Sequence, residues 1–157
     1  MIAVLPQNPD WSAIIAGRAT GPHVEFENGL KEKVRAAGLA DRILFVGEHT
    51  NINEWYRTLD LFIAPQRWEG FGLTPLEAMA TGVPVIATDV GAFPELVGPE
   101  TGEVIARDNL DLMITATRGW IEDEARRAKS SARAHDHVEQ NFSIEGEARS
   151  LGAIYLQ

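Results

Sequence analysis

Five short, nearly continuous apolar runs constrain the fold of this 157-residue chain more than any other feature of its sequence. Strands with one wet face alternate polar and apolar residues, whereas strands buried on both faces of a sheet are apolar throughout. The runs therefore predict an α/β fold with a parallel sheet that is covered by helices. They lie at Ser12–Gly17, Arg42–Gly47, Leu61–Pro65, Val83–Thr88 and Gly102–Ala106.

Helical patterns with clear ends separate the first four runs. A helix over Glu27–Ala37 is followed by Gly38 and Leu39, which is a typical C-terminal stop. Asn51 is expected to cap a helix over Ile52–Thr58. Thr74 is expected to cap a helix that has Pro75 at its first position and ends at Gly82.

The chain after the last run is predicted to be helical. Three helices are expected, at Asn109–Arg118, Glu122–Gln140 and Ile144–Leu156, so that a C-terminal helix lies within residues 142–157. Glu122 and Arg126 are four residues apart and are expected to pair on the middle helix. The order of elements predicts one β/α domain with a helical C-terminal segment.

Composition excludes several classes of function. The chain has 14 basic and 23 acidic side chains and a net charge of −9, so we expect no nucleic-acid partner. It has no cysteine, which excludes disulfides, thiol nucleophiles and cysteine-based zinc sites. No segment approaches the roughly 18 apolar residues of a membrane span, and we expect a cytoplasmic protein. An anionic ligand would have to be held by local dipoles or by a few cations.

The histidines do not predict a metal site. His135 and His137 are two apart on a predicted helix and point to different faces. His23 and His49 have no Asp, Glu or His neighbours at ligand spacing. We therefore predict no bound metal.

The segment Ala64–Gly91 carries the most information about function. A strand ends at Pro65, a loop with Gly70 and Gly72 follows, and a helix begins near Thr74. Ligands of open α/β sheets lie outside the carboxyl ends of the strands, and a helix N-terminus offers free N–H groups to an anion. Glu69 and Glu77 flank this loop and are eight residues apart.

Each of these residues also has a structural interpretation. Thr74 and Glu77 form a complete capping box, T-P-L-E, which alone could explain the glutamate. The two glycines could only make a tight turn. Glu69 is either solvated or functional, and local sequence leaves that choice open.

The stretch E-G-F-G-L-T-P-L-E-A-M-A-T-G-V-P-V-I-A-T-D-V-G, with Pro94–Val97 and Thr101–Gly102 beyond it, resembles the signature of the group 1 (family 4) retaining glycosyltransferases. Both glutamates, the glycine loop and the A-x-G-x-P-V stretch are in register with that signature. The resemblance implies a Rossmann-like three-layer α/β sandwich with a parallel sheet, the C-terminal half of a GT-B fold. That half binds the nucleotide-sugar donor.

The resemblance also implies roles for individual residues. Glu77 would hydrogen-bond the ribose hydroxyls of the donor, and Glu69 would be the catalytic residue that faces the transferred sugar. Glu48 and His49 would lie beside the nucleobase. The donor-binding backbone would be that of Gly70, Phe71, Gly72, Leu73 and Thr74. The substrate would be a nucleoside-diphosphate sugar, with no cofactor and no metal, and transfer would proceed by front-face attack through an oxocarbenium-like state.

The chain departs from the family at its start. The first strand, the basic Arg and Lys of the loop after it, and the N-terminal acceptor domain have no counterpart in residues 1–157. We therefore interpret 1–157 as a single donor-binding domain that is inactive alone. The glycan or lipid-linked acceptor would bind the other domain, and the full-length enzyme could lie peripherally at the inner membrane.

Two stretches refine the resemblance. Residues 9–20 and 65–93 look most like mannosyltransferases of the bacterial lipopolysaccharide core, for which the donor would be GDP-mannose. The alternative function is a non-catalytic nucleotide or nucleotide-sugar binding module, or an inactive fragment. Among the remaining residues, Arg67 is interpreted as a surface side chain, Arg18 as a candidate cation for an anion, and Trp68 as a candidate wall of the cleft.

Overall fold

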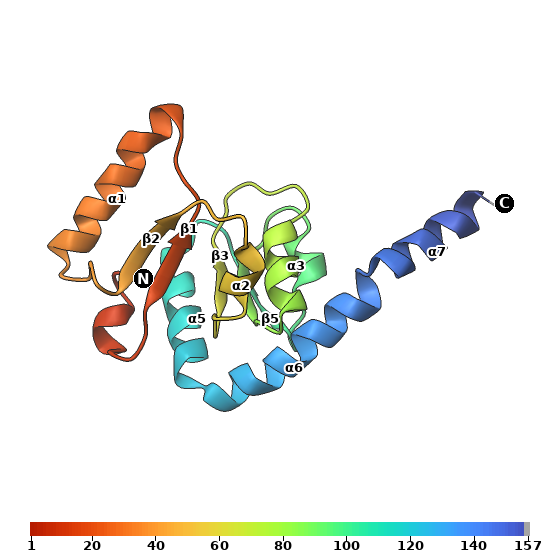
Figure 1. Cartoon of the computed structure of the whole chain (residues 1–157). Coiled ribbons are helices and arrows are strands. Elements are labelled where there is room, and N and C mark those ends of the chain that lie inside the picture. The colour runs from red at the N-terminus through yellow and green to blue at the C-terminus, as the bar shows by residue number, and fades with distance from the viewer. Residues whose placement is uncertain (156–157) are drawn as a thin grey trace. The chain divides into compact units, whose positions relative to one another are not determined.

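The five predicted strands are all present in the computed structural model, which describes residues 1–155. Every strand pairing is parallel, so the predicted α/β class with parallel strands is confirmed. The pairings form two sheets, β1-β2 and β3-β4-β5, and the chain divides into two compact units at residue 52. The strands are β1 (Ala13–Ala16), β2 (Ile43–Gly47), β3 (Phe62–Ala64), β4 (Val85–Thr88) and β5 (Gly102–Ile105) (Figure 1).

The N-terminal unit packs one helix, α1 (Val24–Ala36), against the β1-β2 pair. Two 3-10 turns precede α1, η1 (Leu5–Gln7) and η2 (Gly21–His23). The second turn runs directly into α1, which therefore begins three residues before the predicted start. Its C-terminal stop is confirmed, because Gly38 has φ +68° and the Leu39 amide bonds the Val34 carbonyl at 3.1 Å. The buried core of this unit is Leu5, Val34, Leu39 and Ile43.

The C-terminal unit is built around β4, the central strand of the β3-β4-β5 sheet. All four residues of β4 are buried, as expected for a strand covered on both faces. On one face, Ile86 and Ile105 pack against Ala116 and Trp120 of α5 (Leu110–Glu122). Helix α3 (Leu73–Ala80) contacts β3 and β4, and Figure 1 shows the sheet between α5 and α3. This unit is therefore a three-layer sandwich.

Helix α3 begins two residues earlier than predicted. Gly72 is the N-cap, with φ +96° and ψ +53°, and no side chain caps the helix. Thr74 lies inside the first turn, so the predicted T-P-L-E capping box is wrong. The left-handed conformation at Gly72, which glycine adopts without steric penalty, lets the helix start before Thr74. The helix ends as predicted, with the Val83 amide bonded to the Ala78 carbonyl at 3.0 Å.

Short helices complete the middle of the chain. Helix α2 (Ile52–Tyr56) is confirmed but ends two residues before the predicted Thr58. Helix α4 (Phe93–Leu96) follows β4 and buries Phe93 and Leu96. Both aromatic and aliphatic side chains of α4 therefore belong to the core of the C-terminal unit.

The three predicted C-terminal helices are present: α5, α6 (Glu124–Asn141) and α7 (Ile144–Tyr155). Helix α5 runs to Glu122, four residues beyond the predicted end at Arg118. Asn109 and Asp123 cap α5 and α6 through their side chains. The expected Glu122–Arg126 pair on one helix is wrong, because Glu122 ends α5 while Arg126, on α6, bonds Glu103 at 2.9 Å. Predicted Leu156 lies outside the described residues.

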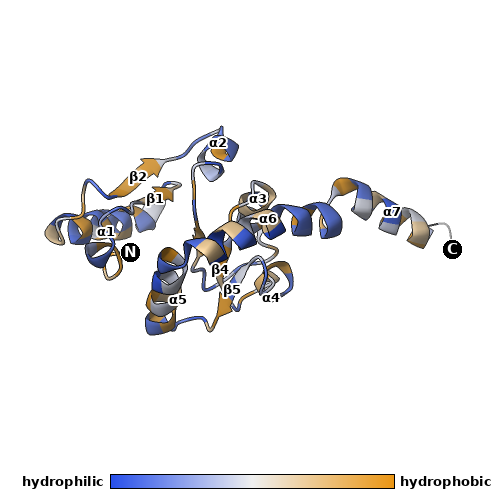
Figure 2. Cartoon of the chain, turned by 90° about the horizontal axis from the view of Figure 1, so that it is seen from below, coloured by the Kyte–Doolittle hydropathy of each residue, from blue (hydrophilic) through white to orange (hydrophobic). Residues whose placement is uncertain are grey.

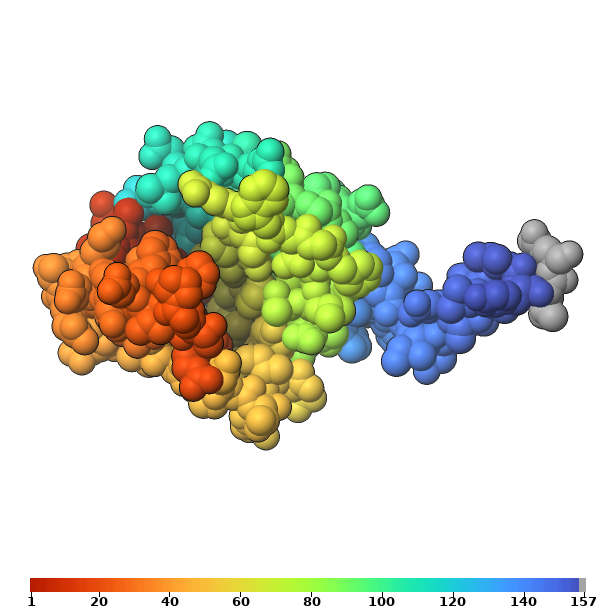
Figure 3. All heavy atoms as spheres, turned by 90° about the horizontal axis from the view of Figure 1, so that it is seen from above, coloured from red at the N-terminus to blue at the C-terminus, as the bar shows by residue number. Residues whose placement is uncertain are grey.

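Helix α6 differs from the strands in the hydropathy of its residues. β2 and β5 are mostly apolar, whereas α6 is largely hydrophilic (Figure 2). Helix α7 extends beyond the rest of its unit, in blue in Figure 3. Its apolar residues Ile144, Leu151, Ile154 and Tyr155 are exposed.

Candidate functional site

The loop between β3 and α3, residues 65–72, lies at the carboxyl end of the β3-β4-β5 sheet and carries the predicted Glu69. The buried Thr88 hydroxyl, at the end of β4, donates to the Gln66 carbonyl at 2.5 Å. A Cβ on Gly91 would overlap the Glu69 carbonyl, so the two backbones are in direct contact there. Two neighbouring segments therefore hold this loop in place.

The N-terminus of α3 presents free backbone donors. The first amides of a helix have no intrahelical acceptor. Within residues 1–155, the amides of Phe71, Gly72, Leu73 and Thr74 donate to no protein acceptor. Gly72 is buried, whereas Phe71 and Leu73 expose their side chains. The loop and helix start therefore offer consecutive donors with positive helix-dipole character to a ligand.

The two predicted carboxylates lie on either side of these donors in the chain. Glu69 is half-buried, and its Oε1 accepts the Gly70 amide at 2.8 Å. Glu77 is half-buried on α3, and its Oε2 accepts the Tyr56 hydroxyl at 3.0 Å. Because Thr74 does not cap the helix, capping no longer accounts for Glu77.

Side-chain contacts connect the loops at this end of the sheet. Asp89, after β4, accepts the Arg107 amide at 2.7 Å. Arg67 pairs with Asp108, after β5, at 2.5 Å. The Arg67 side chain is 74% exposed, which confirms the surface interpretation. The loops after all three strands are thus linked to one another.

Glu48 and His49 belong to the N-terminal unit and follow β2. Glu48 pairs with Arg18 at 3.3 Å, and both side chains are mostly exposed. The His49 Nε2 atom lies 2.8 Å from the Val46 carbonyl oxygen, to which a protonated Nε2 would donate. Arg18 and Glu48 therefore lie together at the carboxyl ends of the paired strands β1 and β2.

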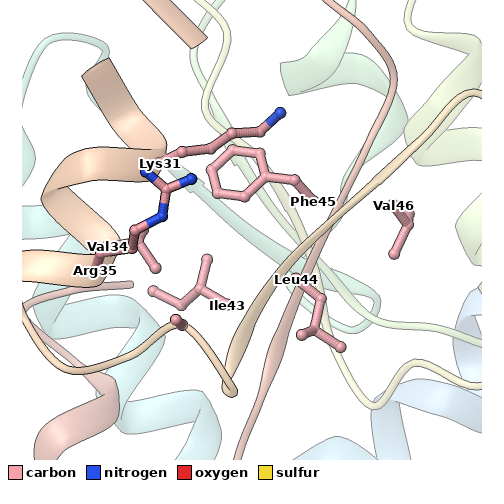
Figure 4. A pocket seen from close by; sticks show the side chains of 8 residues that line it. Lys31, Val34, Arg35, Ile43, Leu44, Phe45 and Val46 are labelled. Carbon is pink, nitrogen blue, oxygen red and sulfur yellow. The ribbon is translucent and has the colours of Figure 1, made fainter. Parts of the chain in front are cut away.

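The remaining candidates are a pocket of the N-terminal unit and Trp68 of the β3–α3 loop. A pocket in the N-terminal unit is lined by α1 and β2, with Lys31 above the Phe45 ring (Figure 4). It contains none of the predicted site residues. Trp68 exposes 85% of its surface. Among residues 1–155, no three His, Cys, Asp or Glu side chains cluster as metal ligands.

Two residues that contact the candidate site were not identified from the sequence. Tyr56 is buried and lies 21 positions before Glu77, its hydrogen-bond partner. Thr88 holds the Glu69 loop through its hydrogen bond to the Gln66 carbonyl, and it lies at the end of a strand whose sequence is otherwise apolar. No local motif signals either contact, because both depend on how the elements pack.

The comparisons place this fold and loop in one class of protein, the glycosyltransferases. The chain belongs to the family described as Glycosyl transferases group 1, which matches residues 1–137. The family and fold predicted from the E-G-F-G-L-T-P-L-E stretch are thereby confirmed.

The relatives that match are longer than this chain. Lipopolysaccharide core biosynthesis mannosyltransferase LpsB of Rhizobium meliloti (strain 1021) is 65% identical over 158 residues, covering 99% of this chain and 45% of LpsB. The C-terminal domain of the glycosyl transferase group 1 protein LpcC from Francisella tularensis superimposes with a TM-score of 0.85 at 35% identity, covering 91% of this chain and 75% of that chain. Anabaena Alr3699/HepE in complex with UDP gives a TM-score of 0.86 at 26% identity, covering 97% and 44%. The chain thus spans less than half of the length of LpsB.

No helix within residues 1–155 is long and apolar enough to cross a membrane.

Proposed function

We propose that this chain is the donor-binding part of a retaining glycosyltransferase that transfers a hexose from a nucleoside-diphosphate sugar to an acceptor hydroxyl. The observation that carries the proposal is the run of free amides from Phe71 to Thr74, flanked by Glu69 and Glu77. A diphosphate needs several donors, and a diol pairs well with a carboxylate. Both kinds of group occur in this one segment.

Charge fits this proposal. The chain carries a net charge of −9, and an acidic surface opposes anion binding. Backbone amides and a helix N-terminus attract a diphosphate without adding basic side chains. In the proposal, the amides of Phe71, Gly72, Leu73 and Thr74 hold the diphosphate and sugar hydroxyls, and Glu77 accepts hydrogen bonds from the ribose.

Glu69 is the proposed catalytic residue. Its Oε1 is taken by the amide of Gly70, which fixes the carboxylate beside the loop. The carboxylate would accept hydrogen bonds from the transferred sugar and stabilise positive charge that develops at the anomeric carbon. The assignment of Glu48 and His49 to the nucleobase stays a prediction.

The relatives support a choice of donor and acceptor. LpsB is named as a lipopolysaccharide core mannosyltransferase, so we propose mannose as the sugar and GDP-mannose as the donor. HepE was solved with UDP, so UDP-sugars are the competing donors to test. The acceptor, a cell-surface glycan or its lipid-linked precursor, would bind a further domain, and this chain alone would not turn over. The proposal includes no metal, so EDTA should leave affinity unchanged.

Isothermal titration calorimetry tests this function. The chain is titrated with GDP, GDP-mannose, UDP and UDP-glucose, and Glu77→Ala should weaken the nucleotide that binds about tenfold or more. Glu95→Ala on α4 is the matched control, because Glu95 is exposed and should leave affinity unchanged. Binding without turnover supports the donor-binding role. No binding of any nucleotide would contradict it and leave an inactive fragment.

A further inference from the structure

Tyr56 makes a contact that local sequence does not explain. It is the last residue of α2, is only 4% exposed, and donates its hydroxyl hydrogen to Glu77 Oε2 at 3.0 Å. Its ring meets the Phe62 ring edge-on, with centroids 5.8 Å apart and planes at 70°. The ring is therefore held by packing, and the hydroxyl is directed at one carboxylate oxygen.

The Glu77 carboxylate is only partly used by the protein. Oε2 accepts the Tyr56 hydroxyl, and within residues 1–155 Oε1 has no hydrogen-bond partner. An ionised carboxylate has about four lone-pair sites on its two oxygens. The contact with Tyr56 therefore fixes the side chain and leaves acceptor capacity for a ligand.

We propose that Tyr56 is a positioning residue for Glu77, holding Oε2 so that Oε1 is presented to the ribose hydroxyls of the donor. This role rests on the proposed function, in which Glu77 binds the ribose. A side chain that is already ordered loses less conformational freedom when a ligand binds. Tyr56 acts through Glu77 and does not itself touch the donor.

The Tyr56 hydroxyl stays protonated and can therefore donate its hydrogen bond to Glu77 at neutral pH. Burial, together with the hydrogen bond to Glu77 and the charge of that carboxylate, raises the pKa of Tyr56 above its ordinary value. The hydroxyl therefore keeps its hydrogen through the neutral pH range. The hydrogen-bond donor to Glu77 is therefore present throughout this pH range.

A purely structural role for the Tyr56 hydroxyl makes a different prediction. In that case, removing the hydroxyl would lower the stability of the chain, and any effect on nucleotide affinity would be independent of Glu77. A positioning role requires that the loss of the hydroxyl has no further effect once Glu77 is gone. A double-mutant cycle separates the two.

The cycle compares the 157-residue chain with Tyr56→Phe, Glu77→Ala and the double variant by calorimetry with GDP and UDP. Tyr56→Phe should weaken the nucleotide that binds about three- to tenfold, and should add nothing in the Glu77→Ala background. The matched control is Thr58→Val, which removes a hydroxyl bonded to the Trp55 carbonyl at 2.8 Å near the same helix end. The Thr58→Val variant should bind the nucleotide with the same affinity as the unchanged chain.

A second readout needs no nucleotide. The chain has two tyrosines, and Tyr155 is 85% exposed. With ¹³Cζ-labelled tyrosine, Glu77→Ala should shift the NMR signal of Tyr56 and leave that of Tyr155 in place. No shift of Tyr56 overturns the contact and the positioning role with it.

The outcomes of the two readouts are distinct. If nucleotide binds and the two variants act additively, Tyr56 is not a positioning residue, while the proposed function stands. If no nucleotide binds the unchanged chain, the proposed function fails, and this role of Tyr56 fails with it. Non-additive loss together with the selective NMR shift supports the proposal.

Discussion

Replacing Gly72 by alanine should destabilise the C-terminal unit and displace the start of α3. Gly72 has φ +96°, a conformation that L side chains rarely adopt. A Cβ there would lie 2.5 Å from Cε1 of Phe93 and 3.1 Å from Cδ1 of Leu96. Phe93 is fully buried and Leu96 is 2% exposed, so neither side chain can move into solvent without disrupting the core.

Two terms set the size of the effect. A left-handed conformation costs a residue with a Cβ about 1–2 kcal/mol. Overpacking a buried site typically costs about 1–3 kcal/mol more. Together they predict a loss of about 2–5 kcal/mol, which should lower the urea midpoint by about 1 M or more.

Urea unfolding followed by circular dichroism measures this loss. The matched control is Gly70→Ala in the same loop, because a Cβ on Gly70 meets nothing within 4 Å and its φ is not positive. The control should change stability by no more than about 0.5 kcal/mol. Equal midpoints for the two variants would show that the backbone conformation and packing at Gly72 are not what fixes this turn.

Two further predictions concern contacts outside the loop. Glu103→Ala leaves the buried Trp120 indole N–H without its acceptor, which lies at 2.9 Å. It should lower the free energy of unfolding in urea by about 1–3 kcal/mol, whereas the control Glu122→Ala should change it little. A hydrogen bond from Lys31 and then one from a backbone amide lower the pKa of Glu27, so its contribution to stability is present above the ordinary carboxyl pKa and is lost as pH falls through the lowered value. Glu27→Gln should therefore lower the urea midpoint at pH 7, with the difference from the unchanged chain shrinking at acid pH; an undiminished difference at pH 3 would contradict this.

The strands and their class could be predicted from the sequence because burial on both faces leaves a composition signal in each strand. All four residues of β4 are buried, and its sequence is continuously apolar up to Thr88. The pairing of strands depends on tertiary packing. The composition of the strands therefore does not predict the division into a two-stranded and a three-stranded sheet.

The start of α3 shows where local signals compete. Thr74 and Glu77 have the spacing of a capping box, and Gly72 has the freedom to start the helix earlier. Packing of Phe93 and Leu96 against Gly72 favours the earlier start. Those two residues are some twenty positions away in the chain, so local sequence could not rank the two starts.

Partners of the site residues were harder to predict than the residues themselves. The loop glycines and both glutamates are visible in the sequence as a motif. The Tyr56–Glu77 contact joins the end of α2 to α3, and Arg126 on α6 reaches Glu103 on β5 instead of Glu122, which ends α5. Such contacts depend on the packing of whole elements, which spacing along the chain does not encode.

The central claim is that the free amides at the start of α3 bind the diphosphate of a sugar donor. Two-dimensional ¹H–¹⁵N NMR of the chain, titrated with GDP and with UDP, tests it directly. The account predicts that the amide signals of Phe71, Gly72, Leu73 and Thr74 shift in a saturable way with one of these nucleotides, while that of Gly119, within α5, stays in place. Saturable binding that leaves those four signals unmoved would contradict the account.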